Sequence, residues 1–282
     1  MKSQAGGNAL SILSRRWVVT VWLLGLTVLT SCAPALRTET APADAPFTAE
    51  DLARNFEEIV FRYEFRFDDQ GRQIDEPLTK PLKRWEGTIR YRLTGDGVVP
   101  EDHRTVADLA ARIEPLTGLA FQEADSGEDM LISIASSSGA ERIVADLEAR
   151  DWTAHRERYE QWRENSHWIC GATLSASRDE PNRLVDAHIF LRAETTGLRR
   201  RACLHEEITQ ALGLTNDSAT ARPSIFNDDQ EFALLTRHDE ILLRALYHPS
   251  LRPGMAAEEA MPTARAVLEM LLAKHHGTGG NP

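Results

Sequence analysis

"LHEEITQALGLTND", residues 204–217, is the stretch that decides the fold. At about 100° per residue, its apolar side chains fall on one face of a helix: Leu204, Ile208, Ala211 and Leu212. Polar side chains occupy the opposite face, and Gly213 stands where a helix would end. The pattern predicts a helix that packs on a core through one face and presents the other to solvent or to a cleft.

The polar face carries acids near the spacing of a catalytic zinc helix. Such a helix needs two ligands four residues apart and a Glu directly after the first ligand, which acts as the base. A register that starts at His205 fails, because Thr209 then stands at the second ligand position. A register that starts at Glu206 places Glu207 at the base position and Gln210 at the second ligand position. We therefore prefer the second register.

With Gly213 as the turn, this spacing resembles the extended metzincin motif of ligand, base, ligand, glycine turn and third ligand. The resemblance implies Glu207 as the general base. The implied metal ligands are Glu206, Gln210 and Asn216, with Asp217 as an alternative third ligand. Carboxylate and amide oxygens suit harder ions better than they suit zinc, so zinc or another divalent cation is expected to bind weakly.

The remaining elements also resemble a metzincin fold. The strands are expected at 85–93, 119–124, 130–136, 167–177 and 184–193. The helices are expected at 101–118, 139–164, 236–247 and 257–275, besides the helix quoted above. This order implies an α+β, zincin-like domain: a mixed twisted sheet, a long active-site helix and a small C-terminal helical part. The core would cover about 83–250, with the charged helix at 139–164 as an insertion.

Two stretches after the central helix extend the resemblance. "PSIFNDD", residues 223–229, resembles the metzincin Met-turn, with Phe226 where the Met would stand. "LTRHDEILLRALY", residues 235–247, resembles the helix that closes such domains. Together with "EEITQALGLTND" and "LRPGM", these stretches also look like an uncharacterised proteobacterial lipoprotein family, the domain of unknown function 2927. That family implies no activity.

The N-terminus has the layout of an export signal. Arg15 and Arg16 precede a short apolar run that ends at "LTSC", which resembles the lipobox of bacterial lipoproteins. We expect a signal peptide at 1–31 and a lipid on Cys32, which would anchor the protein to the periplasmic side of the cell envelope, at the outer membrane. Residues 32–46 are expected to form a tether, and residues 47–282 a single domain that opens with a helix.

Charge and cysteine content limit the partners further. Without the first 31 residues the chain has 29 basic and 43 acidic side chains, a formal charge of −14, so nucleic acid is an unsuitable partner. With Cys32 lipidated, Cys170 and Cys203 are the remaining thiols, and an oxidising compartment predicts a disulfide between them.

Three functions remain open from the sequence. The first is a membrane-tethered binding protein with a degenerate metallopeptidase site, whose partner is a protein or another envelope component. The second is an active metal-dependent hydrolase that uses Glu207 as the base. The third is a purely structural lipoprotein, in which Glu206 and Gln210 are merely solvated.

Overall fold

The computed structural model describes residues 45–62, 79–227 and 231–277, with side chains up to Lys274. All of these residues belong to a compact unit that spans residues 34–282. The predicted signal peptide at 1–31, the lipidation site Cys32 and most of the tether lie outside the described residues. Within the described parts, no helix combines the length and the apolar character that crossing a membrane requires.

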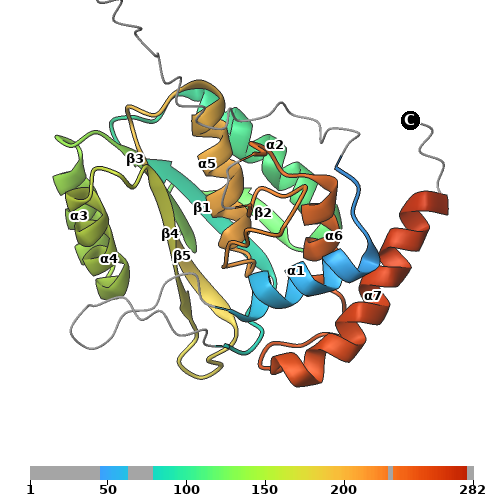
Figure 1. Ribbon diagram of the computed structural model, residues 1–282. Coiled ribbons are helices and arrows are strands. Elements are labelled where there is room, and N and C mark those ends of the chain that lie inside the picture. Colours follow the sequence, from blue (N-terminus) through green and yellow to red (C-terminus); the bar gives the residue numbers. More distant parts are fainter. Residues whose placement is uncertain (1–44, 63–78, 228–230, 278–282) are drawn as a thin grey trace, which may run out of the picture. The chain divides into compact units, whose positions relative to one another are not determined.

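A five-stranded sheet forms the centre of this unit (Figure 1). Its strands are β1 (Thr88–Thr94), β2 (Ala120–Glu123), β3 (Met130–Ala135), β4 (Cys170–Ala176) and β5 (Leu184–Arg192). They lie in the order β2-β1-β3-β5-β4. The first four are parallel, and β4 pairs antiparallel with β5 at the edge of the sheet. The mixed sheet expected from the sequence is thereby confirmed.

Seven helices accompany the sheet in the described residues. They are α1 (Ala49–Phe61), α2 (Pro100–Thr117), α3 (Ala140–Ala149), α4 (Thr153–Glu164), α5 (Gly197–Gln210), α6 (Arg237–Leu246) and α7 (Ala257–Gly277). Figure 1 shows α3 and α4 on one side of the sheet and α2, α5 and α6 on the other. The fold is therefore a mixed α+β fold, as the sequence predicts.

The side chains of β3 divide between two separate apolar cores. Met130, Ile132 and Ile134 join the larger core beneath α2, α5 and α6. Leu131 and Ala135 join a smaller core that includes buried side chains of α3 and α4. Successive side chains of a strand point to opposite faces, and a strand covered on both faces must be apolar throughout. This explains why the run "MLISIA" alternates so little in polarity.

The segment 139–164 differs from expectation, because it forms two helices and not one. α3 ends at Ala149, α4 begins at Thr153, and Asp151 between them has a φ of 59°. This left-handed conformation breaks the helical path and reverses the chain, so that both helices can bury apolar side chains against the sheet. Ile143 and Leu147 of α3 and Tyr159 of α4 are all at most 2% exposed. The segment is therefore an integral layer of the domain.

The first described helix, α1, has Thr48 as its N-cap. The Thr48 hydroxyl accepts a hydrogen bond from the backbone N–H of Asp51 at 3.1 Å, and the Asp51 carboxylate accepts one from the Thr48 N–H at 2.9 Å. The Thr48 hydroxyl also donates to the Asp51 carboxylate at 2.7 Å, and this bond, followed by the one from the Thr48 N–H, lowers the pKa of Asp51 to about 2. The helix then packs against α6 and α7.

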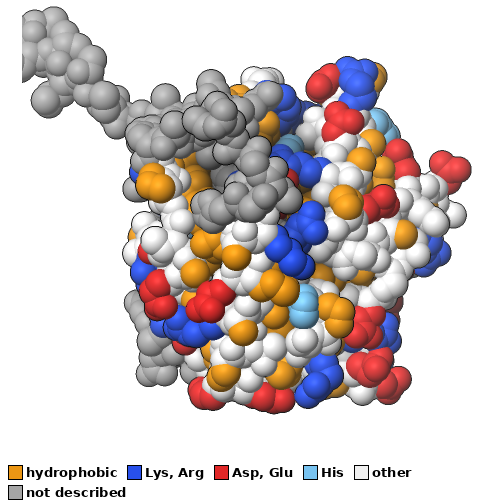
Figure 2. Space-filling view, turned by 90° about the vertical axis from the view of Figure 1, so that its right-hand side faces the viewer, with side chains coloured by type: hydrophobic (Ala, Val, Ile, Leu, Met, Phe, Trp, Pro, Cys, Tyr) orange, Lys and Arg blue, Asp and Glu red, His pale blue; other side chains and the backbone are white. Residues whose placement is uncertain are grey.

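Charges of both signs are interspersed on the face seen in Figure 2. Lys and Arg side chains lie among Asp and Glu, with apolar side chains between them. Several of the charges are paired on this domain, such as Arg265 with Glu50 at 2.8 Å. The part of this face formed by described residues shows no broad basic surface.

Candidate functional site

A cavity of about 290 Å³ lies beside the polar face of α5. Its walls come from α4, β4, β5, α5 and the loop that follows α5. The helix contributes Glu206, Glu207 and Gln210, and the loop contributes Asp217. The structure thus brings the predicted base and two predicted ligands into one cavity, where the loop places Asp217 and not Asn216.

Burial of the opposite face of α5 fixes this orientation. The apolar residues predicted for that face are all at most 2% exposed: Leu204, Ile208, Ala211 and Leu212. They join the larger core. Because these side chains point to the core, the residues opposite them must point to the cavity.

His205 lies outside the lining of this cavity, in agreement with its rejection as a ligand. Its Nδ1 accepts a hydrogen bond from the backbone N–H of Leu235 at 3.2 Å. The Thr209 hydroxyl donates to the backbone carbonyl of His205 at 2.6 Å. The side chains of His205 and Thr209, the two ligand positions of the rejected register, therefore both form hydrogen bonds with the backbone.

Gln210 forms a hydrogen bond to Asp217, another residue of the predicted site. It is 7% exposed, and its Nε2 donates to Oδ1 of Asp217 at 3.0 Å. The bond joins the last residue of α5 to the loop that returns past the cavity. The amide is therefore used to fix the position of a neighbouring carboxylate.

The turn between Gln210 and Asp217 depends on Gly213. Gly213 has a φ of 116°, and a Cβ at this position would lie 2.4 Å from the backbone oxygen of Lys83. Only glycine tolerates both this backbone conformation and this close approach. The chain therefore turns at Gly213, after the end of α5.

Asn216, the implied third ligand, faces a different part of the molecule. Its Nδ2 donates to the backbone carbonyl of Glu58 in α1 at 3.1 Å. Gln210 and Asn216 are thus hydrogen-bonded to other protein groups, and amide ligands suit zinc poorly. In the described ranges, no group of three or more His, Cys, Asp and Glu side chains is arranged to hold a metal ion. The residues as placed do not fit a catalytic zinc, and ligation of a harder ion stays a prediction.

Two other histidines have separate structural partners. His188 is fully buried, and its Nε2 lies 2.7 Å from the Ser133 hydroxyl. Burial, and then the nearby charge of His155, hold the pKa of His188 well below its usual range. His238 is also fully buried, with its Nε2 at 3.0 Å from Nδ2 of Asn55. These histidines therefore do not form an alternative metal site with His205.

Hydrogen bonds to Asp239 hold the loop that carries Phe226. Phe226 is fully buried in the larger core. Ser224 Oγ donates to the carboxylate of Asp239 at 2.5 Å, and the N–H of Ile225 donates to the same carboxylate at 3.1 Å. Asp239 also accepts from the N–H of Thr236, which caps α6. Since Ile225 lines the cavity, Asp239 holds part of its wall in place.

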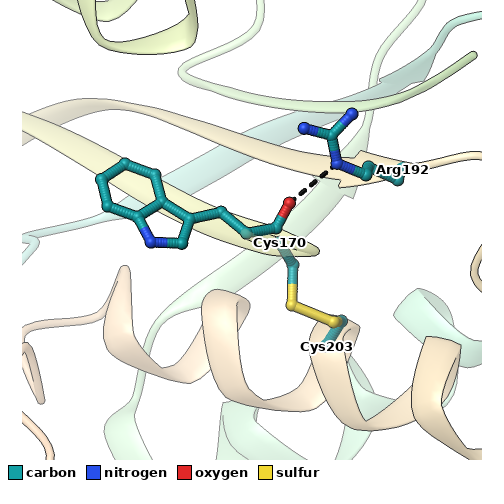
Figure 3. The surroundings of a disulfide bond; sticks show 4 residues. Cys170, Arg192 and Cys203 are labelled. Carbon is teal, nitrogen blue, oxygen red and sulfur yellow. Dashed lines mark hydrogen bonds between the residues drawn. A yellow bond between two sulfur atoms is a disulfide. The ribbon is translucent and has the colours of Figure 1, made fainter. Parts of the chain in front are cut away.

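The predicted disulfide between Cys170 and Cys203 is present. It joins β4 to α5, and both cysteines line the cavity (Figure 3). Beside it, Arg192 donates from Nε to the carbonyl of Trp168 at 2.8 Å, and its guanidinium lies over the ring of Trp162 at 4.5 Å. A covalent bond and a partly buried arginine therefore hold the cavity walls together.

Sequence reasoning missed the rest of the lining. The aromatic walls are Trp162, Trp168, Phe190 and Phe232, and two arginines, Arg158 and Arg199, complete the set of charges. Trp162 of α4 and Phe190 of β5 follow the apolar periodicity of their elements, which indicates only a core, and Trp168 and Phe232 lie in connecting segments. No spacing in the sequence connects them to α5.

No curated protein matches this chain. A model of the family described as "Protein of unknown function (DUF2927)" matches residues 49–266, which include all of the cavity described above. Because this match covers most of the chain, the protein belongs to the DUF2927 family.

Proposed function

We propose that this protein is an exported, lipid-anchored binding protein with a zincin-like, metzincin-type domain whose cavity retains ligand-binding residues but no catalytic metal site. Lipid on Cys32 would hold the domain at the periplasmic side of the envelope. The proposal is supported by the order of strands and helices and by the position of α5 beside the cavity.

The observation that carries the proposal is the hydrogen bonding of the two amides at ligand positions. Gln210 binds Asp217, and Asn216 binds the backbone of Glu58. A ligand in a catalytic zinc site must direct a lone pair at the metal, and zinc must lower the pKa of its water to about 7. The amides of Gln210 and Asn216 hold the loop and α1 in place, a role that suits a stable cavity better than zinc catalysis.

The lining indicates the kind of ligand. Carboxylates from α5 and from the following loop lie in a cavity with aromatic walls and two arginines. Such a lining suits a small polar group with hydrogen-bond donors, for example a side chain or chain end of an envelope protein. The volume is close to the lower limit of about 300 Å³ for small-molecule sites, so only part of a larger partner would enter.

A second candidate is a metal-dependent hydrolase with Glu207 as its base. It is favoured by the presence of Glu206, Glu207, Gln210 and Asp217 in the same cavity. In this case Asp217 would replace Asn216 as the third ligand, and the cation would be harder than zinc.

The test is metal content and peptide hydrolysis by the full chain, purified in detergent without chelator. We expect no stoichiometric metal and no hydrolysis that depends on Glu207. About one metal ion per chain, lost in Glu206→Gln, together with hydrolysis lost in Glu207→Gln, would favour the hydrolase instead.

The binding function is tested separately, by chemical cross-linking to envelope proteins from cells. We expect Glu206→Gln and Gln210→Ala to lose specific cross-links that the control Glu269→Gln on α7 retains. Unchanged cross-links and unchanged cell phenotypes in all variants would favour the purely structural role. Release of the protein from membranes in Cys32→Ala tests the anchor.

A further inference from the structure

A second and larger cavity, of about 420 Å³, lies beside β4. The described residues that line it come from α4, β4, the segment before β1 and the residues that follow α5. Among them are a hydroxyl and an imidazole, those of Thr173 and His155. Neither the predicted metal ligands nor the predicted base belong to the described part of this lining, so the chemistry of the second cavity is separate from that of the first.

Three elements bring a hydroxyl, an imidazole and a carboxylate together at this cavity. Ser175 of β4 pairs with Asp186 of β5, and Thr173 lies two residues before Ser175, so the three side chains share one face of the sheet. Helix α4 packs on β4 and β5 and carries His155, which is 2% exposed. The imidazole therefore lies between the carboxylate of Asp186 and the hydroxyl of Thr173.

The three groups form a continuous series of hydrogen bonds through the imidazole. Nε2 of His155 lies 2.5 Å from Oδ1 of Asp186, and Nδ1 lies 2.5 Å from Oγ1 of Thr173. The other acceptor near this hydroxyl, the backbone carbonyl of His188, is farther away, at 3.4 Å. The ring of Trp152 packs against the imidazole, with the two ring centroids 5.0 Å apart. The imidazole is thus held in one orientation toward the hydroxyl.

The carboxylate decides which imidazole nitrogen carries the hydrogen. Burial alone would raise the pKa of Asp186, but hydrogen bonds from His155 and Ser175 outweigh burial and lower this pKa below its usual range. An ionised carboxylate only accepts hydrogen bonds, so Nε2 carries the hydrogen and Nδ1 directs its lone pair at the hydroxyl of Thr173. A base placed in this way activates a hydroxyl nucleophile in serine hydrolases, where the two ring nitrogens have the opposite roles.

We propose that the second cavity is a carboxylic ester hydrolase site in which Thr173 is the nucleophile, His155 the general base and Asp186 the group that orients the imidazole. Oγ1 of Thr173 attacks the ester carbonyl carbon, and the hydroxyl proton passes to Nδ1 of His155. The bond from the acyl carbon to the alkoxy oxygen breaks, and His155 gives the proton to the alkoxide, which leaves as an alcohol. Water then attacks the acyl-threonine and gives a proton to His155, the carboxylic acid leaves, and Thr173 recovers the proton. The sum is ester and water to acid and alcohol, and no other reactant is needed.

The lining indicates a short acyl group as the substrate. Much of the wall is formed by small or aliphatic side chains: Val60, Ala154, Ala172, Leu174, Ala176 and Leu184. The volume falls within the range of about 300–1,000 Å³ for small-molecule sites. Lys83 lines the same cavity, and its ammonium is suited to stabilise the negative charge that forms on the carbonyl oxygen. This activity goes beyond the binding function proposed above and requires neither a metal ion nor the carboxylates of the first cavity.

The first test is covalent labelling of the full chain, in a neutral detergent, with a fluorophosphonate. An activated hydroxyl oxygen forms a bond to the phosphorus of this probe, fluoride leaves, and the hydroxyl proton passes to the base. We expect a single adduct, located at Thr173 by peptide mass spectrometry. Thr173→Ser, which keeps a hydroxyl, should still be labelled, and Thr173→Val should not.

Further variants separate activation by His155 from mere exposure of a hydroxyl. His155→Gln should slow labelling by about 100-fold or more, the lower end of the usual contribution of a general base. Asp186→Asn should also slow it, because an amide no longer fixes the hydrogen on Nε2. The control Thr215→Val removes another hydroxyl from the same cavity and should leave the rate unchanged. If His155→Gln fails to fold by circular dichroism, Asp186→Asn decides, since its side chain is 23% exposed.

The second test is hydrolysis of 4-nitrophenyl acetate, followed by the release of nitrophenolate. We expect repeated turnover that Thr173→Val loses and Glu207→Gln retains, so this result cannot be confused with hydrolysis at the first cavity. The proposal is overturned by the absence of an adduct at Thr173 in the folded chain, or by equally fast labelling in His155→Gln or Asp186→Asn. It is also overturned if the ester is not turned over, or if its hydrolysis persists in Thr173→Val.

Discussion

Removal of the disulfide should cost a large share of the stability of the domain. Cys170 and Cys203 are 33 residues apart in the sequence. In the chain-entropy relation, the closure of such a loop restricts the unfolded chain by ~3.7 kcal/mol at 25 °C. For a domain of this size, 1 kcal/mol corresponds to about 2–4 °C in Tm, so the expected loss is roughly 7–15 °C.

The assay is thermal unfolding of the full chain, followed by circular dichroism, for the wild type and for Cys170→Ala/Cys203→Ala. Alanine avoids leaving a thiol in the cavity wall. A reductant should lower the Tm of the wild type toward that of the double variant and leave the variant unchanged. A Tm for the variant within ~2 °C of the wild type would refute the reasoning, because the bond would then restrict nothing that folding does not already fix.

Three further predictions concern single residues. Gly213→Ala should lower the free energy of unfolding in urea by more than ~3 kcal/mol, because the new Cβ would meet the backbone oxygen of Lys83. The control Gly197→Ala, also at positive φ but in open space, should lower it by only ~1 kcal/mol. Equal losses would show that the contact at Gly213 is relieved. Asp239→Asn should cost ~2–3 kcal/mol by the same assay, because a neutral amide cannot accept every bond that the carboxylate accepts, and a loss below ~1 kcal/mol would contradict its role as an anchor. Burial holds the folded-state pKa of His188 well below its unfolded value near 6.5, so stability should fall as the pH drops below 6.5. Protonation of the unfolded state alone limits the loss between pH 6.5 and 5 to at most about 1.7 kcal/mol, and the same pH dependence in His188→Gln would refute this.

Most elements of the fold could be predicted from local patterns. The alternation in "TIRYRLT" and the apolar run "MLISIA" are visible in the sequence, and both form strands. Thr48 with Asp51 gives a recognisable helix start, and the structure confirms it. The break between α3 and α4 could not be predicted, because the left-handed conformation of Asp151 is imposed by packing on the sheet and not by a glycine or proline.

The candidate site was accessible to sequence reasoning only along one helix. Helical spacing placed Glu206, Glu207 and Gln210 on the same side of α5, and the cavity contains them. Spacing could not choose between Asn216 and Asp217, because that choice depends on how the chain leaves the turn at Gly213. The aromatic walls come from elements distant in the sequence, so no local pattern marks them.

The division of β3 between two cores has a consequence for the dynamics of the domain. The core under α3 and α4 is the smaller of the two, and it shares only the sheet with the other. Local opening free energies follow the apolar contacts that each region buries, so α3 and α4 should exchange their amide hydrogens sooner than α2, α5 and α6. Because Trp162 and Arg158 belong to α4 and line the cavity beside α5, such an opening would widen that cavity while the larger core stayed folded. A partner too large for the closed cavity could enter by this route.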